Sequence, residues 1–379
     1  MGNRRLDDDA SPVAARAPAA RVLPVIGVAA LAVVAGATCL AVGIGLAPHL
    51  VKDGLTATSV VGLLAALAGL MLLALGVRAV WRRGRLAGRL IVAPLVVVLV
   101  ASAALTLGQA VAATVVPRAP LGTQSPESVG LTYEDVTALT ADGVRLAGWY
   151  VPSRNGAAVV LCHGAGSTRS SVLPHAAVLA SRGYGVLMVD ARGHGESDGR
   201  AMDFGWYGDL DVRAAVDVLT HRPDVVDGRI AVVGLSMGGE EAIGAIGEDD
   251  RIRAVVAEGA TNRVAGDKDW LSEELGVRGL LQEQLDRLTY GAVDLLTPAS
   301  PPPTLRASAA AAAPSPVLLV ASAESFEEVG AARFIASGSP ASVTVWLAPG
   351  GHTGALEADG TEWERRVGGF LGAALAPSG

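Results

Sequence analysis

The chain has 379 residues, too many for one ordinary domain, and 51% of them are hydrophobic. Residues 1–117 carry a net charge of +6 and the remaining residues a net charge of −13, which indicates two parts in different environments. Since the acidic C-terminal part has no basic patch, the sequence argues against nucleic acid as a partner.

Three long stretches without Lys, Arg, Asp or Glu follow an N-terminal tail, residues 1–20, whose composition predicts disorder. Each stretch exceeds the roughly 20 residues that a helix needs to cross the bilayer core. The first is interpreted as a retained anchor because its apolar run is longer than that of a signal peptide. Residues 21–117 are therefore predicted to form a transmembrane region in contact with the lipid bilayer, with helices at about 24–47, 56–77 and 91–116.

The charges between these helices predict their orientation. The segment from Arg78 to Arg89 contains five arginines, whereas the segment between the first two helices carries only Lys52, offset by Asp53. Positively charged loops stay in the cytoplasm. We therefore expect a multi-pass cell-membrane protein with a cytoplasmic N-terminus and with everything after about residue 117 on the outer face.

Beyond a Pro-containing linker at 118–130, residues 131–376 alternate between short apolar runs and segments compatible with helices. This alternation predicts an α/β domain, with a largely parallel sheet covered by helices on both faces. The expected strands are 131–139, 144–151, 157–162, 186–189, 230–233, 254–257, 317–320 and 343–347.

Residues 262–315 interrupt this rhythm with an amphipathic stretch at about 269–290 and a Pro- and Ala-rich stretch after it. Two interpretations stay open. The segment is either a helix with a surface linker or a small cap over a functional site.

The strand at 230–233 runs into Gly234-Leu235-Ser236-Met237-Gly238, and a helix-compatible segment follows. A Gly-x-Ser-x-Gly sequence between a strand and a helix is typical of a nucleophile elbow, in which a sharp turn exposes the serine. Glycines two residues before and after the serine avoid collisions with the neighbouring strand and helix. The pattern therefore predicts Ser236 as a nucleophile.

A serine hydroxyl needs a base, and that base needs an orienting carboxylate. His352 is the predicted base because it follows the last strand in a glycine-rich turn downstream of the elbow. The acid should lie between them in the chain. Glu324 is preferred, while Glu258 and the neighbours Glu327 and Glu328 remain alternatives.

An acyl-transfer site also needs two amide donors for the oxyanion. The N–H of Met237 is predicted to be one. The other is expected from the turn His163-Gly164-Ala165-Gly166, with Ala165 as the donor and His163 as a brace for the loop.

The sequence has two cysteines, Cys39 in a predicted membrane helix and Cys162 in a predicted strand, so no disulfide is expected. It has no clustered His and Cys ligands, and neither a metal site nor a cofactor is expected.

Together, the elbow at Ser236, the His163-Gly164 turn, the segment from Asp190 to Ser197 and the late His352 resemble an α/β-hydrolase. The resemblance covers about residues 130–376. It implies a mostly parallel sheet of about eight strands with a Ser–acid–His triad, and a structural rather than catalytic role for Asp190–Ser197.

These residues predict a membrane-anchored serine hydrolase that cleaves an ester, thioester or amide of a small acyl substrate through an acyl-serine intermediate. A serine peptidase or an acyltransferase would use the same groups, and a non-catalytic membrane receptor or scaffold would keep only the fold. The sequence leaves the substrate and the oligomeric state open.

Overall fold

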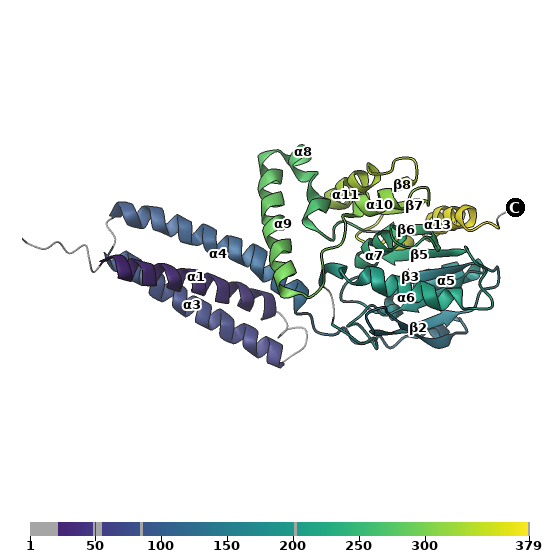
Figure 1. Ribbon diagram of the computed structural model, residues 1–379, viewed down its shortest axis with the longest axis horizontal. Coiled ribbons are helices and arrows are strands. Elements are labelled where there is room, and N and C mark those ends of the chain that lie inside the picture. Colours follow the sequence, from purple (N-terminus) through teal and green to yellow (C-terminus); the bar gives the residue numbers. More distant parts are fainter. Residues whose placement is uncertain (1–21, 48–49, 51–54, 84–85, 201–202, 378–379) are drawn as a thin grey trace, which may run out of the picture.

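The computed structural model describes residues 22–47, 50, 55–83, 86–200 and 203–377. An elongated bundle of three helices leads to a layered α/β domain, with α9 between the two (Figure 1). The predicted disordered tail at 1–20 lies outside the described residues.

The bundle consists of α1 (Val22–Leu46), α3 (Ala57–Arg83) and α4 (Leu86–Thr114). Each contains a stretch long and apolar enough to cross a membrane, with mean hydropathies of 2.2, 2.6 and 2.2 for Val28–Leu46, Ala57–Arg82 and Ala93–Thr114. The helices α3 and α4 extend farther into the Arg-rich segment than the predicted bounds of 77 and 91. Arginine, leucine and alanine are good helix formers, so the helix continues where the apolar run stops.

Glycines at intervals of seven residues let α1 and α3 pack closely. A Cβ atom at Gly36 would lie 2.8 Å from the Leu73 nitrogen, and one at Gly69 would lie 2.5 Å from the Leu40 nitrogen. An added Cβ atom at Gly43 on α1, or at Gly62 or Gly76 on α3, would likewise lie within 3 Å of other atoms of the bundle. Small residues at such contacts are typical of helices that pack within a membrane, where close van der Waals contact replaces the hydrophobic driving force.

The α/β domain is built on one eight-stranded sheet with the order β1-β2-β4-β3-β5-β6-β7-β8. The strands β1 and β2 pair antiparallel, β2 also pairs antiparallel with β4, and the other pairs are parallel. This arrangement confirms the predicted fold class. The strands are β1 (Glu134–Leu139), β2 (Arg145–Val151), β3 (Ala158–Cys162), β4 (Gly185–Val189), β5 (Ile230–Leu235), β6 (Ile252–Glu258), β7 (Val317–Ser322) and β8 (Val343–Ala348).

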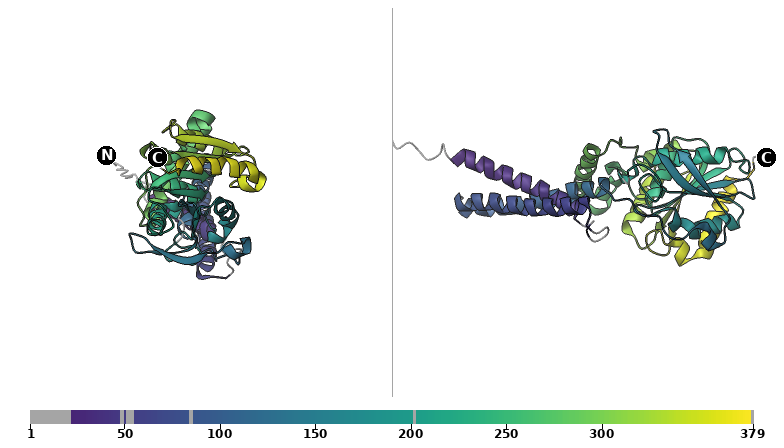
Figure 2. Two further views of the ribbon diagram at one scale, coloured as in Figure 1. Left: turned by 90° about the vertical axis from the view of Figure 1, so that its right-hand side faces the viewer. Right: turned by 90° about the horizontal axis from the view of Figure 1, so that it is seen from below.

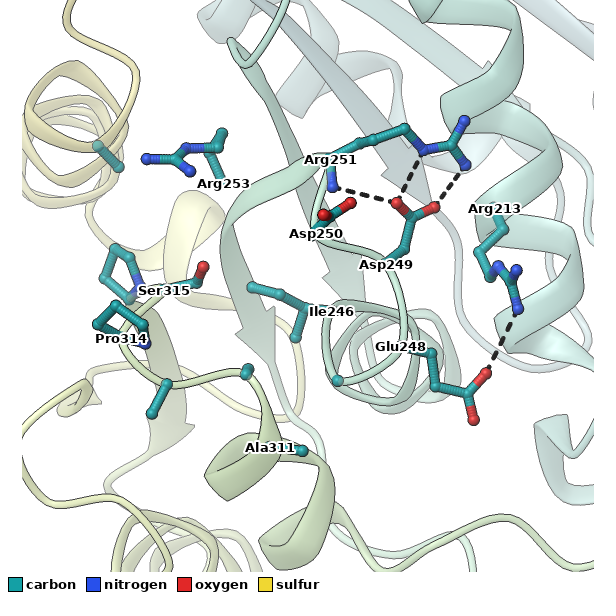
Figure 3. Close-up of a pocket in the computed structure, with 15 residues that line it drawn as sticks. Arg213, Ile246, Glu248, Asp249, Asp250, Arg251, Arg253, Ala311, Pro314 and Ser315 are labelled. Atoms are coloured by element: carbon teal, nitrogen blue, oxygen red, sulfur yellow. Dashed lines mark hydrogen bonds and ion pairs between the residues drawn. The ribbon is translucent and has the colours of Figure 1, made fainter. Parts of the chain in front are cut away.

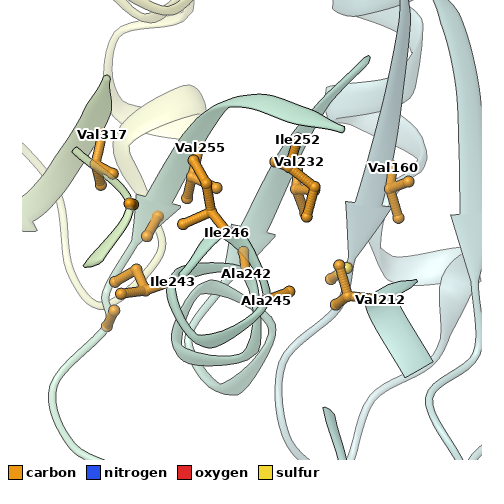
Figure 4. Close-up of a cluster of buried hydrophobic side chains, with 14 of the residues drawn as sticks. Val160, Val212, Val232, Ala242, Ile243, Ala245, Ile246, Ile252, Val255 and Val317 are labelled. Atoms are coloured by element: carbon orange, nitrogen blue, oxygen red, sulfur yellow. The ribbon is translucent and has the colours of Figure 1, made fainter. Parts of the chain in front are cut away.

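Helices cover both faces of the sheet because its central strands are apolar on both sides. One core cluster includes Val160 and Val232 of the sheet and lies between the sheet and α7 (Figure 4). The alternate residues Val159 and Val233 belong to the cluster on the other face. The first face is covered by α6 (Gly208–Thr220), α7 (Met237–Ile246), α10 (Leu305–Ala311) and α11 (Phe326–Ala336), and the second by α5 (Leu173–Ser181) and α13 (Gly360–Ala374).

The chain joins the α/β domain soon after α4 ends. The Arg118 guanidinium donates to the carbonyl oxygens of Gly195 and Ser197, and the Gly195 N–H donates to the Ala119 oxygen at 2.8 Å. Only residues 115–117 lie between α4 and these contacts. The rest of the predicted linker includes the short 3₁₀ helix η2 (Pro126–Val129).

Residues 262–315 form η5 (Ala265–Lys268), α8 (Leu271–Leu275), α9 (Val277–Leu296) and α10. The 20-residue helix α9 runs across the end of the bundle and contacts α4, as two of the views show (Figures 1 and 2). The segment is thus a set of helices, and its longest helix faces the bundle.

Candidate active site

Ser236 lies at the corner between β5 and α7. Its φ of 54° and ψ of −120° place it in a conformation that is strained for any residue with a side chain. The surroundings require the flanking glycines: a Cβ at Gly234 would lie 2.1 Å from the Gly238 oxygen, and one at Gly238 would lie 2.7 Å from the Cys162 oxygen. The local structure is therefore the sharp strand–turn–helix corner that the sequence pattern predicts.

A chain of hydrogen bonds runs from this serine through His352 to a carboxylate. His352 Nε2 lies 2.9 Å from Ser236 Oγ, and His352 Nδ1 lies 2.9 Å from Glu328 Oε1. His352 is half-exposed, whereas the Glu328 side chain is only 5% exposed. The second carboxylate oxygen of Glu328 accepts a 2.8 Å bond from the Ser322 N–H, so this carboxylate is held at the end of β7.

The structure corrects the preference for Glu324 as the partner of His352. Glu324 is exposed in the turn after β7, and Glu327 is exposed and forms a 3.1 Å ion pair with Lys268. Ser325 caps the N-terminus of α11 by accepting from the Glu328 N–H, which brings Glu328 into the first helical turn. That turn directs the Glu328 side chain back toward the sheet edge, while Glu324 stays on the outside of the bend.

The other alternative, Glu258, braces the histidine loop from beneath. Its carboxylate accepts a 2.9 Å bond from the Ala355 N–H and a 3.1 Å bond from Trp363 Nε1. Burial raises the pKa of Glu258. Glu258 therefore joins the loop after His352 to α13 and does not itself bond to the imidazole.

Gly259, which follows Glu258, leaves the space that the imidazole occupies. Its φ is +73°, and a Cβ there would lie 2.8 Å from His352 Cε1 and 2.9 Å from Thr353 Cγ2. Both the backbone conformation and the space thus favour glycine at this position.

We therefore expect Gly259→Ala to push His352 away from Ser236. A displacement of about 1 Å costs on the order of 10²-fold in rate, so kcat should fall by about that factor with KM nearly unchanged. Steady-state kinetics on the full-length protein would measure this. Gly276→Ala is a matched control, because Gly276 also has a positive φ of 56° but an added Cβ there would meet no atom of the described residues within 4 Å. Equal losses for the two variants would show that backbone strain, and not the imidazole contact, is responsible.

A cavity of about 610 Å³ opens beside Ser236 and His352. Apolar groups of Ala165, Pro174, Leu235 and Leu356 line it together with the polar side chains of Ser167, Ser171, His175, Thr353 and Glu357. None of the described residues that line it comes from 262–315. The segment that the sequence offered as a cap or a surface linker therefore contributes no wall to this cavity.

His175 is the buried polar group of this cavity. Within the part of the chain that the structure describes, neither of its ring nitrogens has a hydrogen-bond partner. Burial lowers the pKa of His175 to about 4, so the ring is neutral at pH 7. A neutral imidazole can both donate to and accept from a bound molecule.

The two predicted oxyanion donors lie next to the serine, Met237 directly after it in the chain and Ala165 in the lining of the same cavity. Met237 is the first residue of α7, so its N–H has no acceptor within the helix. Ala165 lies in the turn after β3, where a Cβ at the adjacent Gly164 would come within 3.3 Å of Ser236 Cβ. Both amides thus come from segments that contact the serine.

His163 holds this turn in place. Its Nε2 accepts a 3.0 Å bond from the Ala191 N–H, and its Nδ1 lies 2.8 Å from the Gly164 oxygen. Burial lowers the pKa of His163 to about 3. The residue is therefore a neutral link between two loops, in agreement with the predicted bracing role.

The segment Asp190–Ser197 is a buried structural loop. Asp190 pairs with Arg169 and accepts from the Arg169 and Glu196 amides, while Ser197 Oγ donates to the Asp190 oxygen at 2.6 Å. Arg192 binds Asp211 and Asp142. These contacts connect the β1–β2 turn, the end of β4 and α6, and they engage the charged groups of the loop in ion pairs.

A second, larger hollow of about 830 Å³ lies near the N-terminal ends of β6 and β7, at the opposite end of the strands from Ser236 (Figure 3). It is lined by the end of α7, the start of β6 and the chain before β7, and four of its charged residues form two ion pairs, Arg213 with Glu248 and Arg251 with Asp249. Among the described residues, no group of three or more His, Cys, Asp or Glu side chains is arranged to hold a metal ion.

Comparison with known proteins identifies the class. The α/β domain has the α/β-hydrolase fold, and its similarity to α/β-hydrolases confirms the resemblance seen in the sequence. Residues 153–299 match the family described as Hydrolase_4, serine aminopeptidase, S33. A solved structure of the esterase Pf2001 from Pyrococcus furiosus is similar, with a TM-score of 0.56 and 25% identity over 69% of this chain and 99% of that chain.

Two curated relatives match a smaller region. The protein YfhR of Escherichia coli O157:H7 is 36% identical over 131 residues, which are 32% of this chain and 45% of YfhR. The thiohydrolase AneE of Aspergillus aculeatus is 34% identical over 135 residues, which are 33% of this chain and 41% of AneE. The chain thus spans less than half the length of the curated relatives that it matches.

Proposed function

We propose that the protein is a membrane-anchored serine hydrolase that cleaves esters or thioesters of a small acyl group. The observation that carries this proposal is the pair of 2.9 Å contacts that connect Ser236, His352 and Glu328 at a strained strand–helix corner. A serine with an imidazole at hydrogen-bond distance, and that imidazole oriented by a buried carboxylate, is the arrangement that activates a hydroxyl.

The proposed reaction proceeds in two halves. His352 Nε2 takes the proton of Ser236 Oγ as the oxygen attacks the acyl carbon, and the Met237 and Ala165 amides stabilise the oxyanion. The imidazolium, stabilised through Nδ1 by Glu328, then protonates the departing alcohol or thiol. Water next attacks the acyl-serine, giving its proton to His352, and the acid leaves as Ser236 regains that proton.

The cavity and the relatives favour an acyl ester or thioester. The apolar lining of the cavity, formed by Pro174, Leu235 and Leu356 among others, suits a short acyl chain. The similar solved structure from Pyrococcus furiosus is that of an esterase. AneE is described as a thiohydrolase, which supports a thioester as the second type of substrate. Since the chain covers only part of these relatives, their substrates are a guide rather than an assignment.

A serine peptidase is the second candidate, because the matched family is described as serine aminopeptidase, S33. An aminopeptidase needs a group that holds a free α-ammonium. Glu357 is the one carboxylate among the described residues that line the cavity, and it is exposed. A single solvated carboxylate binds an ammonium group weakly, which makes the ester the preferred substrate.

A panel of substrates tests this preference. Full-length protein in detergent should hydrolyse p-nitrophenyl esters of two to eight carbons far faster than aminoacyl or dipeptidyl p-nitroanilides, and addition of alcohol acceptors should not divert the acyl group from water. Turnover of the anilides alone would favour a peptidase, and acyl transfer to the alcohols would favour an acyltransferase. No turnover of any substrate would favour a receptor or scaffold.

The excess of arginine near the α3–α4 connection supports an orientation with the N-terminus in the cytoplasm and the hydrolase domain on the outer face. A cysteine placed at the exposed Arg365 on α13 should then react with a membrane-impermeant maleimide on intact cells. Reaction only after the membrane is broken would reverse this orientation.

A further inference from the structure

The helix α9 buries one face against the domain and α4, and it leaves an apolar stripe on the opposite face exposed. Gly279, Glu283, Tyr290 and Val293 are buried on one side. Val277, Leu281, Leu288 and Leu295 follow one another at intervals of four and seven residues, and they are 74%, 61%, 61% and 87% exposed. At 3.6 residues per turn this stripe lies on the side of α9 opposite to the buried residues.

Such a stripe is unusual in contact with water. Contiguous exposed apolar side chains on a helix mark a surface that binds a partner or a membrane. Within the described residues no other element covers these four side chains, while Arg278, Arg287 and Asp294 are exposed on the same helix. A helix with an apolar stripe flanked by charged groups has the pattern of one that lies in a membrane interface.

The contact between α9 and α4 indicates which partner covers the stripe. Ala110 of α4 is fully buried in a cluster with Tyr290 and Val293 of α9 and with Trp206. Ala110 lies four residues before Thr114, where the apolar span of α4 ends. At about 1.5 Å per residue, α9 therefore contacts α4 about 6 Å inside the end of the span.

That depth agrees with the position of interfacial helices, whose apolar faces enter about 5–10 Å into the boundary between headgroups and acyl chains. The crosswise course of α9 at the end of the bundle is the course that a helix lying on the membrane surface requires (Figures 1 and 2). The bundle and the hydrolase domain lie on opposite sides of α9 (Figure 1). Because the stripe is opposite the buried residues of α9, we infer that it is turned away from that domain.

We propose that α9 lies in the surface of the same bilayer that α1, α3 and α4 cross, with Val277, Leu281, Leu288 and Leu295 inserted among the upper acyl chains. This inference rests on the proposed membrane anchoring but not on the proposed catalysis. It gives residues 262–315 a role other than a lid: they seat the hydrolase domain on the membrane.

Depth-dependent quenching tests the proposal on the full chain. With Cys39 and Cys162 replaced by alanine, an environment-sensitive fluorophore is attached to Leu288→Cys or Leu281→Cys, and the protein is placed in phosphatidylcholine vesicles. Some of the lipids carry a nitroxide near the top or at the middle of the acyl chain. Val97→Cys, 66% exposed in the span of α4, and Arg365→Cys on α13 serve as matched controls.

We expect the probes on α9 to be quenched several-fold more by the shallow nitroxide than by the deep one. The probe at position 97 should be quenched and the probe at position 365 should not. Absence of quenching at 281 and 288, with quenching at 97, would overturn the proposal. If concentration-dependent crosslinking between copies then appeared at 288, a second chain would be the partner of the stripe. Absence of quenching at 97 would remove the membrane anchoring itself and the proposal with it.

Discussion

Ser236→Ala is expected to abolish covalent labelling by a fluorophosphonate probe and to lower the rate of ester hydrolysis by about 10⁵–10⁶-fold. The reason is that the acyl-enzyme route needs an oxygen nucleophile at this corner, 2.9 Å from His352 Nε2. Alanine keeps the Cβ and the space, so the fold should be unaffected. Gel-based labelling and p-nitrophenyl ester turnover of the full-length protein would measure both effects.

The cavity offers matched controls for this experiment. Ser167 and Ser171 line it, and their hydroxyl oxygens lie 2.6 Å apart, but neither has an imidazole partner among the described residues. Ser167→Ala and Ser171→Ala should keep full labelling. If labelling survived in Ser236→Ala and was lost in one of the controls, the nucleophile would be the other hydroxyl and the proposed mechanism would be wrong.

The second large effect concerns the acid. Glu328→Gln should lower kcat by about 10⁴-fold, with KM little changed, because the amide removes the charge that stabilises the imidazolium and orients the ring. Glu324→Gln should leave kcat unchanged, since Glu324 is exposed and the bond to His352 Nδ1 comes from Glu328. Steady-state kinetics of the two variants would show whether the buried Glu328 or the exposed Glu324, four residues before it, is the partner of His352.

Glu328 is buried, so its variant needs a check on folding. Circular dichroism of Glu328→Gln should match that of the unmodified protein, and the variant should still be labelled by the fluorophosphonate, only more slowly. Glu258→Gln extends the series, because Glu258 braces the loop through Ala355 and Trp363. A loss in Glu324→Gln as large as that in Glu328→Gln would mean that His352 takes a different partner during turnover.

The sequence was sufficient to predict those features that depend on residues close together in the chain. The glycines at 234 and 238 are needed for contacts with the residues around the corner, so the pattern by itself predicts the bend that exposes Ser236. The central strands β3, β4 and β5 could be predicted because each is a short apolar run that is buried on both faces. These features depend on neighbours in the chain more than on distant contacts.

The acid was harder to predict because several carboxylates follow β7 within a few residues. Ser325 and Glu328 have the Ser-x-x-Glu spacing of a helix N-terminus, a signal that marks Glu328 as the residue turned back toward the strand. That signal outweighs proximity to the strand end, which favoured Glu324. The bond to His352, 24 positions away, depends on how the last two βα units pack together.

The position of α9 against the bundle could not be predicted from the sequence pattern. Its amphipathic stretch is visible in the sequence, but the contact with Ala110 joins segments about 180 positions apart. Similarly, the need for glycine at these positions of α1 and α3 can be recognised only when the two helices are seen side by side. Long-range packing of this kind has no local signature.

The short connection after α4 limits where the enzyme can work. Residues 115–117 are the only ones between the helix end and the contacts of Arg118 and Ala119 with the loop at 195–199, and three extended residues span about 10 Å. If the bundle crosses a bilayer as proposed, the domain cannot swing outward to sample bulk solution. Hydrolysis would then be confined to a layer next to the membrane, and molecules enriched at that surface would be turned over faster than their average concentration implies.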